Sequence, residues 1–497
     1  MPMNLIRPAI LFSAFLICSA STVFGQNEED ALRYSNLLPG GTARSWALGG
    51  AMGAVGADPG SATTNPAGFG LYNTSEISFT PQFEVNNAKA DYYGTSTSAS
   101  DNRFSFNNLS LILSYPSEKG GDWRGGVLGI SFDRQAGFHR DEHAVGNNVP
   151  STILQKFANE AKGTYAENLA DQYPFGSSLA WETYAIDTTP EGNVYTPAIP
   201  YGTAMNQDHA ISSGGRLNTT SFFYAANYMD KLYIGASLGL TGLRYDRTTT
   251  HTEANQDTAV DLKDLSYQEK LLTTGSGVDL RIGVIGRATK NLRLGIAFQS
   301  PKWLQLSDAY SYTMSTGFRT PDSNGKYTYS NSSPDGAFNY RIRTPWHILA
   351  SAAWIAGQHG LVSLDYEYTN YKQAKLNKSL DGVDNYDFAK ENNAVQEDFR
   401  STGSLRVGTE WRSGNWYFRG GWGIWPNGYA DSDARQGTAY MRYTAGAGFR
   451  TRHVSIDLAG IYGSRDINYF QYDPALVHAT QERQTDTRGM LTVAFRP

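Results

Sequence analysis

Two short strings in the sequence have the residue types and the spacing of catalytic sites. His139 to His143 reads H-R-D-E-H, the H-x-x-E-H order in which a helix brings two histidines to one zinc ion. Gly235 to Gly239 reads G-A-S-L-G, the pattern in which a strand turns sharply into a helix and exposes the serine as a nucleophile. The first string runs into the loop residues 146–150, and Ser237 lies within unbroken strand alternation. We therefore expect no catalytic residue, no metal site, no cofactor and no enzymatic activity.

Charged side chains form a second candidate set, because they recur at alternate positions of otherwise apolar segments. Arg281, Arg293 and Arg419 are the members we expect to face an aqueous interior. Such a set can select a solute, or charges of opposite sign can pair with each other and hold a plug in place. We favour the second interpretation, because carboxylates alternate with the arginines in the same segments.

The segments that carry these charges have the period-two alternation of β-strands. In residues 277–285, Val278, Leu280 and Ile282 alternate with Asp279 and Arg281. An apolar face toward lipid and a polar face toward a lumen is the pattern of a transmembrane β-barrel wall. The predicted strands are residues 75–85, 104–115, 123–134, 216–229, 231–246, 276–289, 291–305, 339–356, 361–372, 401–412, 415–425, 438–450, 453–466 and 485–496. The predicted fold is all-β, a 14-stranded antiparallel barrel over residues 74–497.

Short turns alternate with long polar loops between these strands, as expected for the two rims of an outer-membrane barrel. The largest predicted extracellular loop is residues 135–215. Within it, Ile153, Leu154 and Phe157 have near-helical spacing, which predicts an amphipathic helix. Two interpretations stay open: a landing site for an apolar ligand, or a lid that packs on itself.

Composition and the first residues agree with an exported β-protein. The chain has 31 Tyr, 23 Phe, 10 Trp and 51 Gly, with only 18% charged residues. Residues 1–25 have one basic residue, an apolar run and small residues before a predicted cleavage site after Gly25. Because Cys18 is the only cysteine and lies in this predicted signal peptide, the exported chain can form no disulfide.

Charge and hydropathy argue against nucleic acid as a partner and against a membrane-spanning helix in the exported chain. The formal net charge is −5 without a basic cluster, which argues against nucleic-acid binding. Beyond the signal peptide, no apolar run reaches the roughly 18 residues that a membrane-spanning helix needs. A membrane location therefore requires a barrel.

The segment before the first strand is rich in small residues and resembles a known plug. Residues 40–70 read GGTARSWALGGAMGAVGADPGSATTNPAGFG, which predicts short helical turns broken at Asp58-Pro59-Gly60 and Asn65-Pro66. This pattern is similar to the N-terminal hatch of the FadL-type family of outer-membrane transporters for long-chain fatty acids and other hydrophobic compounds. Residues 294–301, LGIAFQSP, and residues 418–426, FRGGWGIWP, extend the resemblance along the chain. We define residues 26–73 as the hatch.

The resemblance implies a pathway for cargo. Asn65, Pro66, Ala67 and Gly68 match the hatch motif of the family. In that family a kink in the third strand opens the barrel sideways into the membrane beside the Asn-Pro-Ala of the hatch, so the resemblance implies that Gly125, Gly126 and Gly129 are the corresponding kink residues beside Asn65–Ala67 here. Glycines inside a strand also mark bulges or gaps on general grounds. The implied function is passive uptake of a hydrophobic small molecule across the bacterial outer membrane.

The sequence alone leaves alternatives to this function open. Haem or an aromatic compound is the alternative cargo, and a general diffusion porin is the alternative channel. The expected partners are the hydrophobic ligand, outer-membrane lipids and the barrel-assembly machinery. The machinery is expected to recognise the last strand, in which Phe495 is followed by Arg496 and Pro497.

Overall fold

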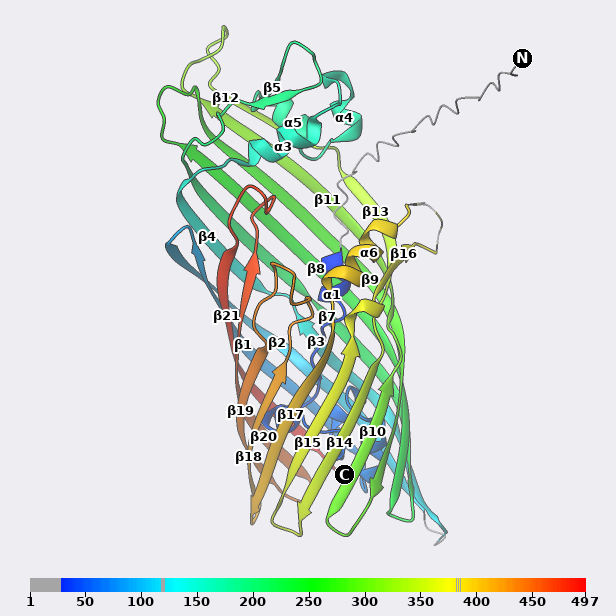
Figure 1. Cartoon of the computed structure of the whole chain (residues 1–497). Helices are drawn as coiled ribbons and strands as arrows, with labels where there is room; N and C mark the ends of the chain where they lie inside the picture. The colour runs from blue at the N-terminus through cyan, green and yellow to red at the C-terminus, as the bar shows by residue number, and fades with distance from the viewer. Residues whose placement is uncertain (1–27, 118–120, 381, 383, 385) are drawn as a thin grey trace, which may run out of the picture.

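The computed structural model describes residues 28–117, 121–380, 382, 384 and 386–497. In this part of the chain one antiparallel sheet closes on itself, because β21 (Thr480–Phe495) pairs with β1 (Glu76–Tyr92). The closed sheet has 14 strand positions among the described residues, which confirms the predicted all-β fold and barrel (Figure 1). The predicted signal peptide, residues 1–25, lies outside the described residues.

Most positions in the wall hold a single strand, and some are shared by two strands that lie end to end. Around the wall the strands after β1 are β2 (Thr95–Pro116), β3 (Trp123–Gly137), β7 (Met205–Tyr228), β8 (Leu232–Asn255), β9 (Leu262–Arg287), β10 (Leu292–Gln299) with β11 (Trp303–Phe318), β14 (His347–Ala356) with β13 (Gly336–Arg343), β15 (Gly360–Asn370) with β16 (Lys375–Lys378), β17 (Ser401–Ser413), β18 (Trp416–Trp425), β19 (Tyr440–Arg450), β20 (Val454–Tyr469) and β21. β4 (Arg140–Val149) extends the third position upward along β7, and β12 (Thr328–Ser332) pairs with β11.

The two faces of the wall differ in polarity as the alternation predicts. In β9, Val278, Leu280 and Ile282 are exposed on the outside, whereas Asp279 and Arg281 are buried on the luminal side. The outer surface is therefore an apolar belt, and polar groups point into the lumen, where they can pair.

The rims of the barrel also differ. One rim has tight turns, such as the one between β7 and β8, where Met229 and Asp230 both have positive φ values of 55° and 56°. Lys231 N closes this turn on the Tyr228 carbonyl at 3.0 Å, and positive φ at both central residues gives it the type I′ geometry that matches the twist of the flanking strands. Figure 1 shows these turns at one end and the helical cap at the other. By the rule for such barrels, the end with short turns is periplasmic.

Several segments predicted as long polar loops are instead extensions of strands. β7, β8 and β9 have 24, 24 and 26 residues, whereas a strand needs only about 9–11 to cross a membrane. Residues 247–255 and 262–275 therefore continue the wall above the lipid belt. The sequence hid this because the outward positions of these extensions are mostly polar, as at Thr250, Gln268 and Lys270, so the apolar outer face that marks a membrane strand disappears.

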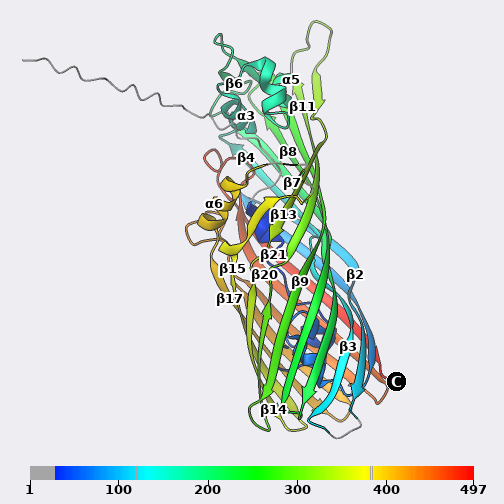
Figure 2. The ribbon, with the colours of Figure 1, turned by 90° about the vertical axis from the view of Figure 1, so that its right-hand side faces the viewer.

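The hatch forms short helical turns inside the barrel. It contains α1 (Glu28–Arg33), α2 (Ala43–Ala47), and the 3-10 turns η1 (Pro59–Ala62) and η2 (Pro66–Leu71). The predicted breaks begin turns: Asp58 and Asn65 cap η1 and η2 by accepting hydrogen bonds from Gly60 N and Ala67 N. Figure 2 shows most of the hatch in the periplasmic half of the barrel. Among the described helices, none has the length and apolarity required to span a membrane.

A cap formed by residues 150–204 lies over the opposite mouth. It contains α3 (Ile153–Ala161), η3 (Ala166–Asn168), α4 (Leu169–Gln172), α5 (Ser177–Glu182) and the hairpin β5 (Ile186–Thr188) and β6 (Tyr195–Pro197). The apolar face of α3 is buried: Leu154 is 0% exposed and Phe157 1%. In this structure the predicted amphipathic helix is thus part of a self-packed lid. A further helix, α6 (Ala389–Asp398), follows the turn η4 (Tyr371–Gln373) and covers α1.

Phe157→Ala is expected to loosen this cap while the barrel stays intact. The Phe157 ring packs edge-on against Tyr267, with 5.1 Å between ring centroids, and its removal should cost about 3–5 kcal/mol of local stability. Limited proteolysis should then cut within residues 150–204. Tyr165→Ala is the control, because the Tyr165 side chain is exposed, and equal cleavage of both variants would contradict the packing role of Phe157.

Candidate transport pathway

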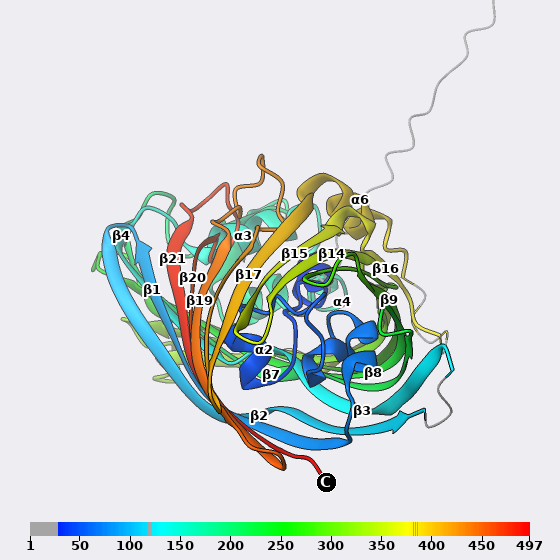
Figure 3. The ribbon, with the colours of Figure 1, turned by 90° about the horizontal axis from the view of Figure 1, so that it is seen from below.

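The hatch fills the lumen of the barrel near its periplasmic end. Seen from below in Figure 3, its turns lie inside the ring of strands. Nearly all of residues 40–70 are buried, including Trp46, Met52 and Phe69. A solute that enters from outside therefore meets a closed floor in this structure.

One buried ion cluster joins the hatch to the wall. Arg44 on α2 donates to the two Glu410 carboxylate oxygens at 2.9 and 3.1 Å. Arg419 approaches the same carboxylate at 2.5 Å and donates to Asp457 at 2.7 Å. This two-point geometry between Arg44 and Glu410 fixes the orientation of α2 as well as its position.

Two further contacts hold the same part of the hatch. The Gly53 amide donates to Asp365, whose carboxylate lies 3.6 Å from the Arg406 guanidinium. Arg442 stacks over the Trp46 ring at 4.6 Å from its centroid. Luminal charges thus pair with one another and with the hatch, which matches the interpretation that we favoured for them.

The three arginines singled out in the sequence all lie on the luminal face. Arg281 donates to the Ala62 carbonyl at 2.7 Å, and Arg293 donates to the Val55 carbonyl at 3.0 Å. Arg419 belongs to the ion cluster described above. Arg281 and Arg293 therefore hold hatch backbone directly, because they satisfy carbonyl groups that its short turns leave free.

The Asn65–Gly68 motif docks on a patch of wall that has no side chains. The Asn65 side-chain amide donates to the carbonyls of Gly53 and Val284 at 2.8 and 3.2 Å. A Cβ added to Gly283 would lie 2.0 Å from Asn65 Oδ1, and one added to Gly235 would lie 2.4 Å from the Pro66 carbonyl oxygen. The wall must therefore be glycine at both positions for the motif to approach.

Within the hatch, Gly68 serves the same close packing, because a Cβ there would lie 2.9 Å from the Gly56 Cα. The sequence analysis did not identify the luminal glycines Gly235, Gly283 and Gly295 as a docking surface for the hatch. Their signal was a glycine at a lumen-facing position of three successive strands.

The β3 glycines lie elsewhere on the wall. Gly125 is at a bulge, where the pairing of β3 with β7 shifts between Trp123 and Gly125. On the outer face the Tyr224 hydroxyl covers Gly126, and on the inner face the Phe223 ring covers Gly129. Phe223 in turn stacks on Phe69 of η2, with 3.5 Å between ring centroids. The hatch residue next to these glycines is therefore Phe69, whereas Asn65–Ala67 dock on β8–β10.

The third strand also loses its pairing with β2 halfway up the barrel. In the described residues, the β2–β3 ladder ends at the pair Asn108–Asp133, although both strands continue. The pairing of β3 with β7 shifts again between Arg134 and Ala136. We call this interruption the β2–β3 split. Residues 134–136 contain no glycine or proline that would mark such an interruption.

Backbone of the hatch lies across the split. Leu38 N donates to the Gln135 carbonyl at 3.4 Å, and the Asn107 side-chain amide donates to the Gly41 carbonyl. Asn107 is the extra residue of a bulge opposite Thr80 and Pro81, so its side chain points inward beside Asn108. The hatch thus satisfies part of the edge that the interrupted ladder leaves open.

A cavity of about 890 Å³ lies above the floor that the hatch forms in the lumen. Its lining includes Asn107, Arg134 and Gln135 at the split, and Tyr472 on the side of the cap. This volume is within the range of binding sites for small molecules. The cavity therefore extends from beneath the cap to the interrupted part of the wall.

The charges that line this cavity are only partly matched. Arg488 pairs with Glu84 and Asp486, and Arg435 pairs with carboxylates that include Glu28 and Glu29. Four arginines on the lining make no ion pair within the described residues: Arg134, Arg140, Arg247 and Arg465. The Arg134 Nε is buried and has no hydrogen-bond partner among the residues that the structure describes. An anionic group would be favoured beside these guanidinium groups.

The two catalytic-looking strings take the structures that their contexts indicated. His143 lies in strand β4 and pairs with Asp208 at 3.0 Å, so the helical arrangement of an H-x-x-E-H site is not formed. Ser237 lies inside β8, where Gly235–Gly239 pairs continuously with β9. In the described ranges, His, Cys, Asp and Glu side chains form no cluster of three or more suited to a metal ion.

Fold and site together define a class of protein. A closed barrel with an apolar outer belt, a polar lumen and an internal hatch is a transmembrane β-barrel with the architecture of bacterial outer-membrane proteins. Comparison with known proteins refines this description. No protein-family model matches the chain, and no curated protein matches it.

Solved structures do match it in fold. A FadL homologue of Pseudomonas aeruginosa aligns with a TM-score of 0.56 at 12% identity, over 92% of this chain and 99% of that one. The toluene transporter TodX of P. putida aligns with a TM-score of 0.53 at 11% identity, over 93% of this chain and 99% of that one. The chain therefore has the fold of these transporter structures along nearly its whole length.

Proposed function

We propose that this protein is an outer-membrane channel for the passive uptake of hydrophobic small molecules. The observation that carries the proposal is the closed floor beneath a cavity that reaches the β2–β3 split. Such a lumen suits a cargo that leaves through the wall, whereas a general porin needs an open passage. The fold shared with a FadL homologue and with a toluene transporter supports the same class of cargo. The proposal includes no enzymatic role and no cofactor.

The proposed cargo is an amphipathic carboxylate with a long alkyl chain, as in a fatty acid. The arginines without ion-pair partners on the cavity wall, Arg134 and Arg247 among them, favour an anionic group over a neutral hydrocarbon. Toluene has no charge to match them. Haem, with two carboxylates on a large ring, is the second candidate that this charge pattern admits.

The proposed exit is sideways into the membrane through the third strand. A long alkyl chain that stays in hydrocarbon avoids a cost of about 25 cal/mol for each Å² of apolar surface exposed to water. We place the opening at the β2–β3 split, where Leu38 and Asn107 contacts would have to separate. Gly125, Gly126 and Gly129 lie below it on the same strand and would permit the bend. Membrane lipids receive the cargo.

The experiment compares uptake of labelled oleate, its methyl ester and toluene by cells that contain the intact protein or a variant altered at Asn65-Pro66-Ala67. Oleate uptake by the intact protein, lost in a variant whose barrel is still folded, would support the proposal. Conductance that is unchanged when residues 40–70 are deleted would favour a general porin. Absence of uptake of all three compounds would contradict the proposed cargo class.

Arg134→Gln combined with Arg247→Gln is expected to lower oleate uptake about tenfold and to leave methyl-ester uptake within about twofold. The reason is that loss of charged hydrogen bonds to a carboxylate costs about 1.5–3 kcal/mol, and 1.4 kcal/mol is tenfold. Arg483→Gln is the control, because Arg483 lies on the outer face of β21 and is exposed. Equal losses for the acid and the ester would show that the arginines do not recognise charge.

A further inference from the structure

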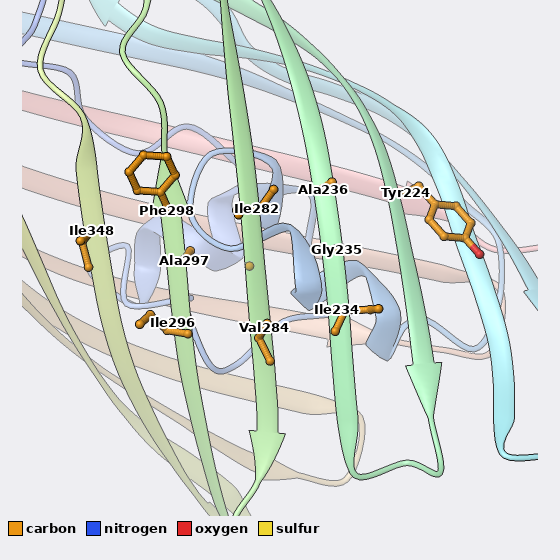
Figure 4. A pocket seen from close by; sticks show the side chains of 11 residues that line it. Tyr224, Ile234, Gly235, Ala236, Ile282, Val284, Ile296, Ala297, Phe298 and Ile348 are labelled. Atoms are coloured by element: carbon orange, nitrogen blue, oxygen red, sulfur yellow. The ribbon is translucent and has the colours of Figure 1, made fainter.

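The outer wall of the barrel has an apolar groove behind the place where the hatch docks. The groove has a volume of about 490 Å³ and crosses β7, β8, β9, β10 and β14. One bank is a cross-strand row that includes Tyr224, Ala236, Ile282, Phe298 and Ile348. The other bank includes Ile234, Val284 and Ile296. Figure 4 shows both rows on the outside of the strands, with the hatch behind them.

The floor of the groove is made of backbone. Gly235 and Gly283 line it from positions that face the lumen, and neither has a side chain to thicken the wall. The docking of Asn65 and Pro66 requires glycine at both positions. Only backbone therefore separates the groove from the hatch at these two positions, and substitution of the floor glycines would displace the hatch.

The position of the groove determines what covers it. Ile234 is four residues beyond Asp230 in the short turn, so the groove lies near the periplasmic rim. Its banks continue into the apolar belt at Leu280 and Leu294, which are exposed to the bilayer. In an outer membrane, the leaflet on this side consists of lipids with acyl chains. Hydrocarbon chains therefore face the groove directly.

The length of the groove matches one such chain. From β7 to β14 it spans four strand spacings, which is about 19 Å at 4.8 Å each. One leaflet of a hydrocarbon core about 30 Å thick gives an acyl chain a length of about 15 Å. A single chain can therefore occupy most of the groove.

We propose that this groove binds one acyl chain of a membrane phospholipid and holds it across β8–β10, over the docking site of the hatch. Lipid tails are as apolar as the wall, so the hydrophobic effect does not favour the groove over the rest of the belt. The preference arises from van der Waals contact with two banks and a floor instead of with a flat surface. The site is independent of the cargo proposed above.

The test uses the full protein in phospholipid nanodiscs that contain a trace of phosphatidylethanolamine with a diazirine on its acyl chain. After photolysis, mass spectrometry compares label on residues 234–236, 282–284 and 296–298 with label on residues 362–366 of β15. The second patch is the matched reference, because Val362, Leu364 and Tyr366 are similarly exposed on β15, which pairs with β14 but does not line the groove. We expect about fivefold more label in the groove.

Ala236→Phe fills the groove from an exposed position and is expected to reduce its label to the level of β15. Leu364→Phe, an equal addition to the reference patch, is expected to leave the groove label unchanged. Equal label on the two patches of the unaltered protein, or full groove label in Ala236→Phe, would overturn the proposal. Displacement of the label by unlabelled oleate but not by unlabelled phospholipid would assign the groove to free fatty acid instead.

Discussion

Replacing Glu410 with alanine is expected to lower the free energy of unfolding by about 3–5 kcal/mol and to make the barrel conduct ions. Glu410 is the carboxylate that Arg44 of the hatch and Arg419 of the wall share. Its loss leaves Arg44, which is 6% exposed, with Asp58 at 3.9 Å as its remaining ion pair. Water must reach these guanidinium groups to solvate them, and α2 has to move to admit it. Urea unfolding and single-channel conductance in planar bilayers measure the two effects.

Glu397→Ala is the matched control, because Glu397 lies on the exposed side of α6, far from the hatch ion cluster. Its effect should stay within about 0.5 kcal/mol. A variant without residues 40–70 should conduct strongly, and Glu410→Ala should raise its conductance no further. If Glu410→Ala remains closed to ions and loses no stability, the ion cluster does not hold the hatch.

The barrel itself could be predicted because its signal is local. Every wall residue faces either lipid or lumen, so alternations such as Val278-Asp279-Leu280 record the orientation of each side chain in the sequence. The hatch turns were similarly readable, since Asp58-Pro59 and Asn65-Pro66 are both a cap followed by proline. Where the strands rise above the membrane this signal ends, and β8 and β9 extend further than predicted.

The docking surfaces could not be predicted, because they depend on which residues meet across the lumen. Gly235 and Gly283 are ordinary small residues of two strands until Asn65 and Pro66 are placed against them. The β2–β3 split is hidden for the same reason, because the sequence only suggested a strand end near residue 134, whereas β3 continues to Gly137 and it is the pairing with β2 that stops. The β3 glycines were visible in the sequence, but the prediction that they lie beside Asn65–Ala67 required a register that no local pattern contains.

The contact between Asn65 and Gly283 is expected to be required for transport, so that a change to either residue lowers uptake. Asn65→Ala removes the amide that donates to Gly53 and Val284 and the oxygen that caps η2. Gly283→Val adds side-chain atoms where Asn65 Oδ1 now lies, at 2.0 Å from the site of the new Cβ. Each change should destabilise the docked position of the turn by about 1–3 kcal/mol. The displaced turn should then lower oleate uptake about tenfold.

The double variant makes this prediction specific. If both changes act by displacing the same turn, the combination should transport no worse than the poorer single variant, instead of about a hundredfold worse as independent effects would require. Gly242→Val is the control for adding a branched side chain to the wall, because a Cβ at Gly242 meets nothing within 4 Å. Additive losses would mean that Asn65 and Gly283 act separately, and the hatch motif would then have a role other than docking on this wall. Non-additive loss with the barrel folded would show that the wall glycines Gly235 and Gly283 and the Asn65–Gly68 motif act together as one docking contact that positions the hatch for transport.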